Sequence, residues 1–280
     1  MTNRYCAAGV LFALLLSGLS VAAQSDPWRT LSIQPPKNGW FYVIAHRGAH
    51  VGIPENSLPA YEKAIELGAD FVEVDIRTTK DGHFVSIHNR TVDAYTTAVQ
   101  GEVSGFTLAE LKAIDIGSRV GPEWREERIP TFEEILKRVR GRCGIYLDIK
   151  DAPIPALADL LMKYDMVRDT VWCLSPARVP ALRAACPDCV EMADPGKETN
   201  IARVMKDYQP RMLAPVWRDF SPTYASRTAG TDITIFVDEA DETSWEKALA
   251  WGAHGIQTDD PEGLISFLAA QKRTVRRNPE

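Results

Sequence analysis

An α/β barrel of eight parallel strands, each followed by a helix, is the fold that this sequence of 280 residues predicts. Short apolar runs alternate with amphipathic helical stretches from residue 41 onward. Eight such runs can be counted, and regular alternation of this kind is typical of a parallel sheet covered by helices. Several runs are apolar almost throughout, as expected for strands buried on both faces. A doubly wound open sheet is the alternative.

The elements can be placed in order by their periodicity and by the residues that end them. The first helix, for example, is expected to begin after Ser57, whose hydroxyl can cap it, and to stop at Gly68. The predicted strands are 41–46, 71–76, 145–149, 170–174, 190–193, 212–216, 233–237 and 255–258. The predicted helices are 58–67, 132–139, 155–163, 179–185, 201–208, 222–227, 244–251 and 262–270.

The segment from Asn89 to Pro130 is longer than an ordinary connection between a strand and a helix. It contains one short helical stretch, Leu108 to Ile114. We therefore expect residues of about 89–130 to form a small insertion after the second strand that covers one rim of the barrel.

The first two dozen residues have the layout of a secretory signal peptide. Arg4 supplies positive charge, residues 10–16 are apolar, and Val21-Ala22-Ala23 is a small-residue cleavage pattern. The apolar run is short for a membrane span, and nothing later in the chain is typical of one. The sequence predicts a signal peptide (1–23) and a mature domain (24–280), exported to the periplasm or secreted, with no stable membrane span.

Composition and cysteine spacing narrow the class of protein further. The formal net charge of −6 argues against a general nucleic-acid binder, because such proteins present basic surfaces. Cys186 and Cys189 form a Cys-Pro-Asp-Cys motif, for which an exported setting favours a disulfide over a redox or zinc site. Cys143 and Cys173 could pair or stay buried thiols, and the sequence leaves both possibilities open.

One predicted hairpin gathers two carboxylates and an imidazole on one face. Asp81-Gly82 is a favourable two-residue turn, which would place Asp75 directly opposite His88. Such partners approach within about 5.5 Å between Cβ atoms, and Glu73 shares the face of Asp75 because it is two residues away. Two carboxylates at the end of a buried strand are costly unless a cation is present, which indicates a hard divalent ion. The alternative is a surface hairpin whose charges face water.

Two further strand ends are rich in charged side chains. His46-Arg47-Gly48 follows the first strand, and Asp148-Ile149-Lys150 ends the third. Because barrel enzymes place their chemistry at the carboxyl ends of the strands, these residues and the hairpin are predicted to form one site.

In these segments the sequence resembles the glycerophosphodiester phosphodiesterase family. The order and spacing of several motifs agree with the family over nearly all of the mature chain from residue 41. The matching motifs are Ala45-His46-Arg47-Gly48, Pro54-Glu55-Asn56-Ser57, Glu73-Val74-Asp75, Thr79-Lys80-Asp81-Gly82, Ile87-His88, Ile129-Pro130-Thr131, Leu147-Asp148-Ile149-Lys150 and Gly255-Ile256-Gln257-Thr258-Asp259.

The resemblance implies a metal-dependent phosphodiesterase that hydrolyses glycerophosphodiesters or related small phosphodiesters to an alcohol and a phosphomonoester such as glycerol 3-phosphate. The implied roles are general acid and base for His46 and His88, phosphate binding for Arg47 and Lys150, and ligation of Ca²⁺ or Mg²⁺ for Glu73, Asp75 and Asp148. Imidazole suits proton transfer near neutral pH, and cations neutralise charge on the nonbridging oxygens. Which histidine is the acid is left open.

Several positions depart from the family pattern and bear on specificity. Asp148 stands where the family usually has glutamate, Asn89 where it has aspartate, and Phe236 where it has tryptophan. Glu55, Trp217 and Phe236 are predicted to line the substrate pocket. These departures allow a substrate other than a simple glycerophosphodiester, and the alcohol head group is left open.

Two alternatives to this function are retained. The first is a lipid phosphodiesterase, similar to lysophospholipase D or to phosphatidylinositol-cleaving enzymes, although the polar character of residues 89–130 argues against it. The second is an exported phosphoester-binding protein without catalysis, which Asp148 and Asn89 favour and the two histidines oppose.

Overall fold

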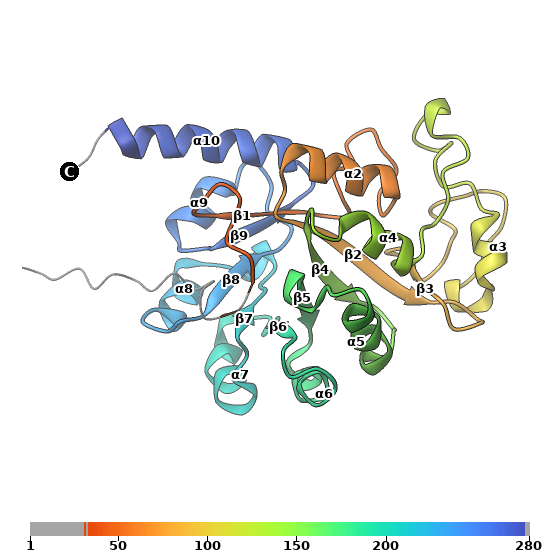
Figure 1. The fold of residues 1–280 in the computed structure, drawn as a ribbon. Helices are drawn as coiled ribbons and strands as arrows, with labels where there is room; N and C mark the ends of the chain where they lie inside the picture. Colours follow the sequence, from red (N-terminus) through yellow and green to blue (C-terminus); the bar gives the residue numbers. More distant parts are fainter. Residues whose placement is uncertain (1–30, 32, 278–280) are drawn as a thin grey trace, which may run out of the picture.

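Eight parallel strands close into a barrel in the computed structural model, which describes residue 31 and residues 33–277 (Figure 1). The strands are β1 (Tyr42–Ala45), β2 (Phe71–Thr78), β3 (Phe84–Ser86), β4 (Gly144–Ile149), β5 (Thr170–Leu174), β6 (Val190–Ala193), β7 (Met212–Leu213), β8 (Thr234–Val237) and β9 (Gly255–Thr258). Because β1 pairs with both β2 and β9, the ring is closed, and the open-sheet alternative is excluded. Strand β3 lies off the ring and pairs antiparallel with β2. The predicted signal peptide lies outside the described residues.

The helices follow the strands around the ring. They are α2 (Leu58–Leu67), α3 (Leu108–Lys112), α4 (Phe132–Val139), α5 (Ile154–Lys163), α6 (Val179–Ala185), α7 (Ile201–Tyr208), α8 (Pro222–Thr228), α9 (Trp245–Ala250) and α10 (Pro261–Arg277). The predicted ends of α2 are confirmed: the Ser57 hydroxyl accepts a bond from the Ala60 N–H, and Gly68 ends the helix at a φ of 89°. No helix in this part of the chain is both long enough and apolar enough to cross a bilayer.

Aromatic rings fill the barrel interior near the amino-terminal ends of its strands. The rings of Tyr42, Phe71 and Phe236 lie with their centroids 5.1–5.9 Å apart, and Leu31 and Ile33 pack into the same cluster. Phe236 is 0% exposed and so cannot line a substrate pocket. The prediction that it does is wrong, because strand stagger places Phe236 level with the start of β9 rather than at the barrel mouth.

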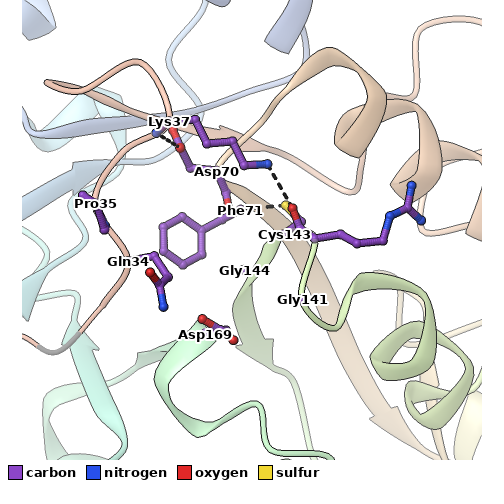
Figure 2. Close-up of a pocket in the computed structure, with 10 residues that line it drawn as sticks. Gln34, Pro35, Lys37, Asp70, Phe71, Gly141, Cys143, Gly144 and Asp169 are labelled. Carbon is purple, nitrogen blue, oxygen red and sulfur yellow. Dashed lines mark hydrogen bonds between the residues drawn. The ribbon is translucent and has the colours of Figure 1, made fainter.

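The amino-terminal end of the barrel also holds a cavity of about 440 Å³, which Figure 2 shows. The Lys37 ammonium donates to the carbonyls of Ala69 (2.6 Å) and Arg142 (3.1 Å). The Asp70 carboxylate accepts from the backbone N–H groups of Lys37 (2.6 Å) and Val43 (2.8 Å). These contacts fasten the segment before β1 to the barrel, at the end opposite to the carboxyl ends of the strands.

The segment expected to be an insertion has a small core of its own beside β3. Val92, Tyr95, Val103 and Leu111 are buried in a cluster separate from the two barrel clusters. The Trp124 indole N–H donates to the Gly52 carbonyl (2.8 Å), which ties this segment to the connection between β1 and α2. Residues that precede α4 thus contact the loop that follows β1, at the end of the barrel where the strands finish.

The hairpin of β2 and β3 has a register that differs by one residue from the predicted one. Ile76 pairs with Ser86, and the Ile87 N–H donates to the Asp75 carbonyl (3.1 Å). Asp75 therefore lies opposite Ile87 and not opposite His88, so the predicted cross-strand pair of Asp75 and His88 is wrong.

The cause of this shift is the loop. The Thr79 N–H donates to the His83 carbonyl (2.9 Å), which leaves three residues in the turn. A two-residue type I′ turn needs positive φ at both central residues, but within Asp81-Gly82 only the glycine has one, of 85°. A three-residue loop with glycine in the left-handed position satisfies the same sequence.

The four cysteines within the described residues divide into one pair and two single thiols. Cys186 and Cys189 form the predicted disulfide, which is confirmed. Cys143, at the end of the loop before β4, and Cys173, in β5, are both free, so of the two possibilities left open the structure has separate thiols.

Candidate functional site

Three carboxylates gather on β2 and β4, which are neighbours in the ring. Glu73 and Asp75 point to the same side of β2, and Asp75 pairs in register with Asp148 on β4. One oxygen from each of the three lies within 4.8 Å of the others. Glu73 is 1% exposed and Asp75 is 0% exposed, so water screens their mutual repulsion poorly.

Burial and charge perturb these carboxyls in opposite directions. Burial, together with the neighbouring Asp75 and Asp148, raises the pKa of Glu73 well above its usual value. Burial also disfavours the charged form of Asp75, but the Lys150 ammonium and an N–H of Asn56 outweigh it and lower the pKa of Asp75. Of these two carboxyls, Asp75, which lies beside the Lys150 ammonium, therefore ionises more readily than Glu73.

Two cationic side chains flank the three carboxylates. The Lys150 ammonium lies 2.8 Å from Asp75 Oδ1 and 2.6 Å from Asp148 Oδ2. The Arg47 backbone N–H donates to Glu73 Oε2 (2.7 Å), and its guanidinium lies 3.8 Å from Asp75. Three carboxylates against two cations leave this cluster one negative charge in excess when all groups are ionised.

The donor set fits a divalent metal ion. All three groups offer oxygen ligands, which hard cations such as Ca²⁺ and Mg²⁺ prefer. Asp75 Oδ1 is buried, lies 2.8 Å from the Lys150 ammonium and accepts no well-aligned hydrogen bond, so it keeps a lone pair for an ion. The excess negative charge of the cluster also favours a bound cation. Glu73, Asp75 and Asp148 are the residues that would hold the ion, in agreement with the sequence-based prediction.

His46 follows β1 and contacts the end of the last strand. Its Nδ1 lies 2.6 Å from Asp259 Oδ1, and β1 and β9 are neighbours in the ring. The hydrogen bond with His46, followed by weaker charge effects, lowers the pKa of Asp259. His50 lies 3.6 Å from the same carboxylate and bonds the His46 carbonyl at 2.9 Å. No role at the site was predicted for Asp259 or His50, although the position of Asp259 directly after the last strand was a usable signal.

His88 follows β3 and is fastened through its backbone. Its carbonyl accepts two hydrogen bonds from the Arg77 guanidinium (3.1 and 2.8 Å), and its Nδ1 lies 3.0 Å from Asn89 Oδ1. His88 is also close enough to Asp75 for its charge to lower the pKa of that carboxyl. The chain bends after β3 and brings His88 to the carboxylates despite the shifted register.

The remaining predicted pocket residues differ in their placement. Glu55 accepts a bond from the Arg47 guanidinium (3.3 Å) and so adjoins the cluster. Trp217 follows β7 and stacks on Trp251 with 5.3 Å between ring centroids, so much of its ring is used in packing. Phe236 is buried far down the barrel, as described above.

Two hollows are each lined in part by a residue predicted for the site, His46 in one and Lys150 in the other. One, of about 400 Å³, is lined by His46, Glu239, Glu242 and Asp259 among others. A second, of about 540 Å³, is lined by Arg77, Arg90, Lys150 and neighbouring loop residues.

This chain is similar in sequence to proteins of one family. The model of the glycerophosphoryl diester phosphodiesterase family matches residues 46–181. A glycerophosphodiester phosphodiesterase of Caldanaerobacter subterraneus subsp. tengcongensis is 31% identical over 242 residues, which cover 81% of this chain and 97% of that protein. One from Bacillus subtilis is 36% identical over 116 residues, or 39% of each chain.

Solved structures have the same fold. A glycerophosphodiester phosphodiesterase from Agrobacterium tumefaciens superposes with a TM-score of 0.66 at 25% identity, covering 79% of this chain and 97% of that one. A phosphodiesterase from Oleispira antarctica, solved in complex with the product sn-glycerol-3-phosphate, gives a TM-score of 0.76 at 22% identity, covering 84% and 100%. The similarity to the Oleispira antarctica structure supports the barrel fold.

Proposed function

This chain belongs to the glycerophosphodiester phosphodiesterase family, and from that premise we propose that it hydrolyses small glycerophosphodiesters, with a divalent cation, to an alcohol and glycerol 3-phosphate. The observation on which the proposal chiefly depends is the convergence of Glu73, Asp75 and Asp148 between Arg47 and Lys150 at the barrel mouth. The glycerol 3-phosphate bound to the Oleispira antarctica phosphodiesterase is consistent with that product.

The chemistry divides between charge neutralisation and proton transfer. When bound, a divalent cation supplies Lewis-acid stabilisation of the charge that develops on the nonbridging phosphate oxygens. Arg47 and Lys150 add positive charge at the same place and orient the phosphate. Glu55, which bonds the Arg47 guanidinium, limits the positions that this side chain can take.

His46 and His88 act as the general acid and base. One takes the proton of the attacking hydroxyl, which is that of water in the step that releases glycerol 3-phosphate. The other gives a proton to the departing alkoxide, as cleavage of an ester at neutral pH requires. Asp259 orients the His46 ring through its Nδ1, which leaves Nε2 for the substrate. Asn89 has the corresponding position beside His88, but as an amide it brings no charge.

The proposed cellular setting is outside the cytoplasm, in the periplasm or secreted. The signal-peptide pattern of residues 1–23 supports it, and so does the disulfide between Cys186 and Cys189, because such bonds persist in oxidising compartments.

A product assay tests the function. The purified protein is incubated with glycerophosphocholine, glycerophosphoethanolamine or a lysophosphatidylcholine, each with Ca²⁺, with Mg²⁺ or with chelator. We expect glycerol 3-phosphate from the two soluble diesters only when a cation is present, and slower cleavage of the lysolipid. Binding of the diesters without any product would contradict the proposal and favour a binding protein.

A further inference from the structure

A buried amide joins one of the three carboxylates to two hydroxyl groups. The Asn56 Nδ2 donates to Asp75 Oδ2 (2.8 Å), and the Asn56 Oδ1 accepts from the hydroxyls of Tyr61 and Ser86 (both 2.9 Å). The two hydroxyl oxygens are themselves 2.8 Å apart. All four side chains are at most 2% exposed. They come from the connection before α2, from α2 itself, from β3 and from β2.

The orientation of this amide follows from the chemistry of its neighbours. A carboxylate only accepts hydrogen bonds, so the amide must turn its nitrogen toward Asp75 and its oxygen toward the hydroxyls. Burial raises the pKa of Tyr61 well above its usual value, so its hydroxyl keeps the proton that it donates. The backbone of Asn56 is fixed as well, since its N–H donates to the Arg47 carbonyl (3.0 Å) at a φ of 53°.

This arrangement distinguishes the two oxygens of Asp75. Its Oδ2 accepts the Asn56 N–H, whereas its Oδ1 is buried without an aligned hydrogen bond and lies 2.8 Å from the Lys150 ammonium, on the cationic side of the cluster. Asn56 therefore fixes the plane of the carboxylate and leaves Oδ1 as the oxygen for a cation. A buried ligand fixed in this way does not lose rotational freedom when an ion binds.

The two hydroxyls are redundant. Each hydroxyl has one proton, and three short contacts join the two hydroxyl oxygens and Asn56 Oδ1. Only one proton can lie between the two hydroxyls, so at least one is donated to the amide oxygen. If either hydroxyl is removed, the other still reaches the amide oxygen directly. Only the loss of both leaves that oxygen buried without a donor.

We propose that Tyr61 and Ser86 are positioning residues for the metal site, which hold Asn56 so that it orients Asp75 toward a divalent cation. This inference rests on the proposed function only in taking Asp75 as a ligand of that cation. Neither hydroxyl contacts substrate or ion; both act through Asn56. A purely structural role would cost stability without changing the affinity for the ion.

The test measures Mn²⁺ binding to chelator-stripped protein, by calorimetry or by the electron paramagnetic resonance signal of free Mn²⁺. We expect Tyr61→Phe and Ser86→Ala each to raise Kd less than about threefold, and the double variant to raise it about 10- to 100-fold. Asn56→Gly, which accepts the left-handed backbone, is expected to match the double variant, and adding the other two changes to it should raise Kd no further. Asn56→Gly also tests the inference if the double variant does not fold.

Matched controls remove buried hydroxyls that have no hydrogen-bond partner. Tyr224→Phe makes the same change as Tyr61→Phe, and Thr234→Val exchanges a buried strand hydroxyl for a methyl group. Both lie outside the contacts of Asp75 and should leave Kd within twofold (about 0.4 kcal/mol) of the parent. The inference is overturned if the double variant and Asn56→Gly bind Mn²⁺ like the parent, which would leave the proposed function intact. Absence of Mn²⁺ binding in the parent protein would instead overturn both.

Discussion

Replacement of His88 or His46 by alanine is expected to lower kcat for glycerophosphocholine by about 10²- to 10⁴-fold, because each would remove one proton transfer from the reaction. Both side chains are only half-buried and neither is one of the three carboxylates that would hold the cation, so the fold and the affinity for a cation should persist. Turnover is measured at saturating substrate, with circular dichroism to check the fold.

His83→Ala is the matched control for the histidine variants. His83 lies in the hairpin loop with 55% of its side chain exposed, and its nearest charged partner, Asp81, is 3.9 Å away. We expect its removal to leave kcat within about twofold, as for a surface substitution away from special features. Full turnover in either His46→Ala or His88→Ala would show that the acid and base are assigned wrongly.

Loss of the cation is the second change with a large expected effect. Chelation, or Glu73→Gln, is expected to lower kcat by on the order of 10³-fold, since metal stabilisation of a phosphoryl transition state supplies several kcal/mol. Adding Ca²⁺ or Mg²⁺ back should restore the chelated parent but not the variant, which lacks one ligand. The measurement is the rate of glycerol 3-phosphate release as a function of added cation.

Asp194→Asn provides the comparison for Glu73→Gln. Asp194 follows β6, and burial raises its pKa, but it does not belong to the three-carboxylate cluster. Its neutralisation should leave the affinity for the cation unchanged. The cation is not bound at the three carboxylates if the chelated protein keeps its full rate. The same follows if Asp194→Asn lowers the affinity for the cation as strongly as Glu73→Gln does.

Much of the fold could be predicted from periodicity because its determinants are local. The limits of α2, for instance, depend on the Ser57 hydroxyl and on the left-handed Gly68, both within one turn of the helix ends. Strand β7 ends sooner than predicted, because Pro215 lacks the N–H that the ladder would need.

The gathering of Glu73, Asp75 and Asp148 was predictable from the sequence, but the hydrogen bonds and register around them were not. Asp81-Gly82 is compatible with a two- or three-residue loop, and the choice depends on packing of the hairpin, so the register of Asp75 could not be fixed from the sequence. The contact of His46 with Asp259 spans 213 residues and exists only because the ring closes. The depth of Phe236 in the barrel likewise follows from strand stagger, which no single strand encodes.

The hydroxyl pair illustrates the same limit at the level of one side chain. Tyr61 has the spacing of an ordinary core residue of α2, and nothing local indicates that its hydroxyl meets Ser86 of β3. Only the assembled barrel brings these groups to Asn56.

The central claim is that Glu73, Asp75 and Asp148 together bind one divalent cation beside the two histidines. Crystals grown with Mn²⁺ and glycerol 3-phosphate test it most directly, through an anomalous difference map. We expect one strong peak in contact with an oxygen of each carboxylate, with the phosphate on the side of Arg47 and Lys150. A map without a peak between these three side chains, or with the ion and phosphate bound elsewhere, would contradict it.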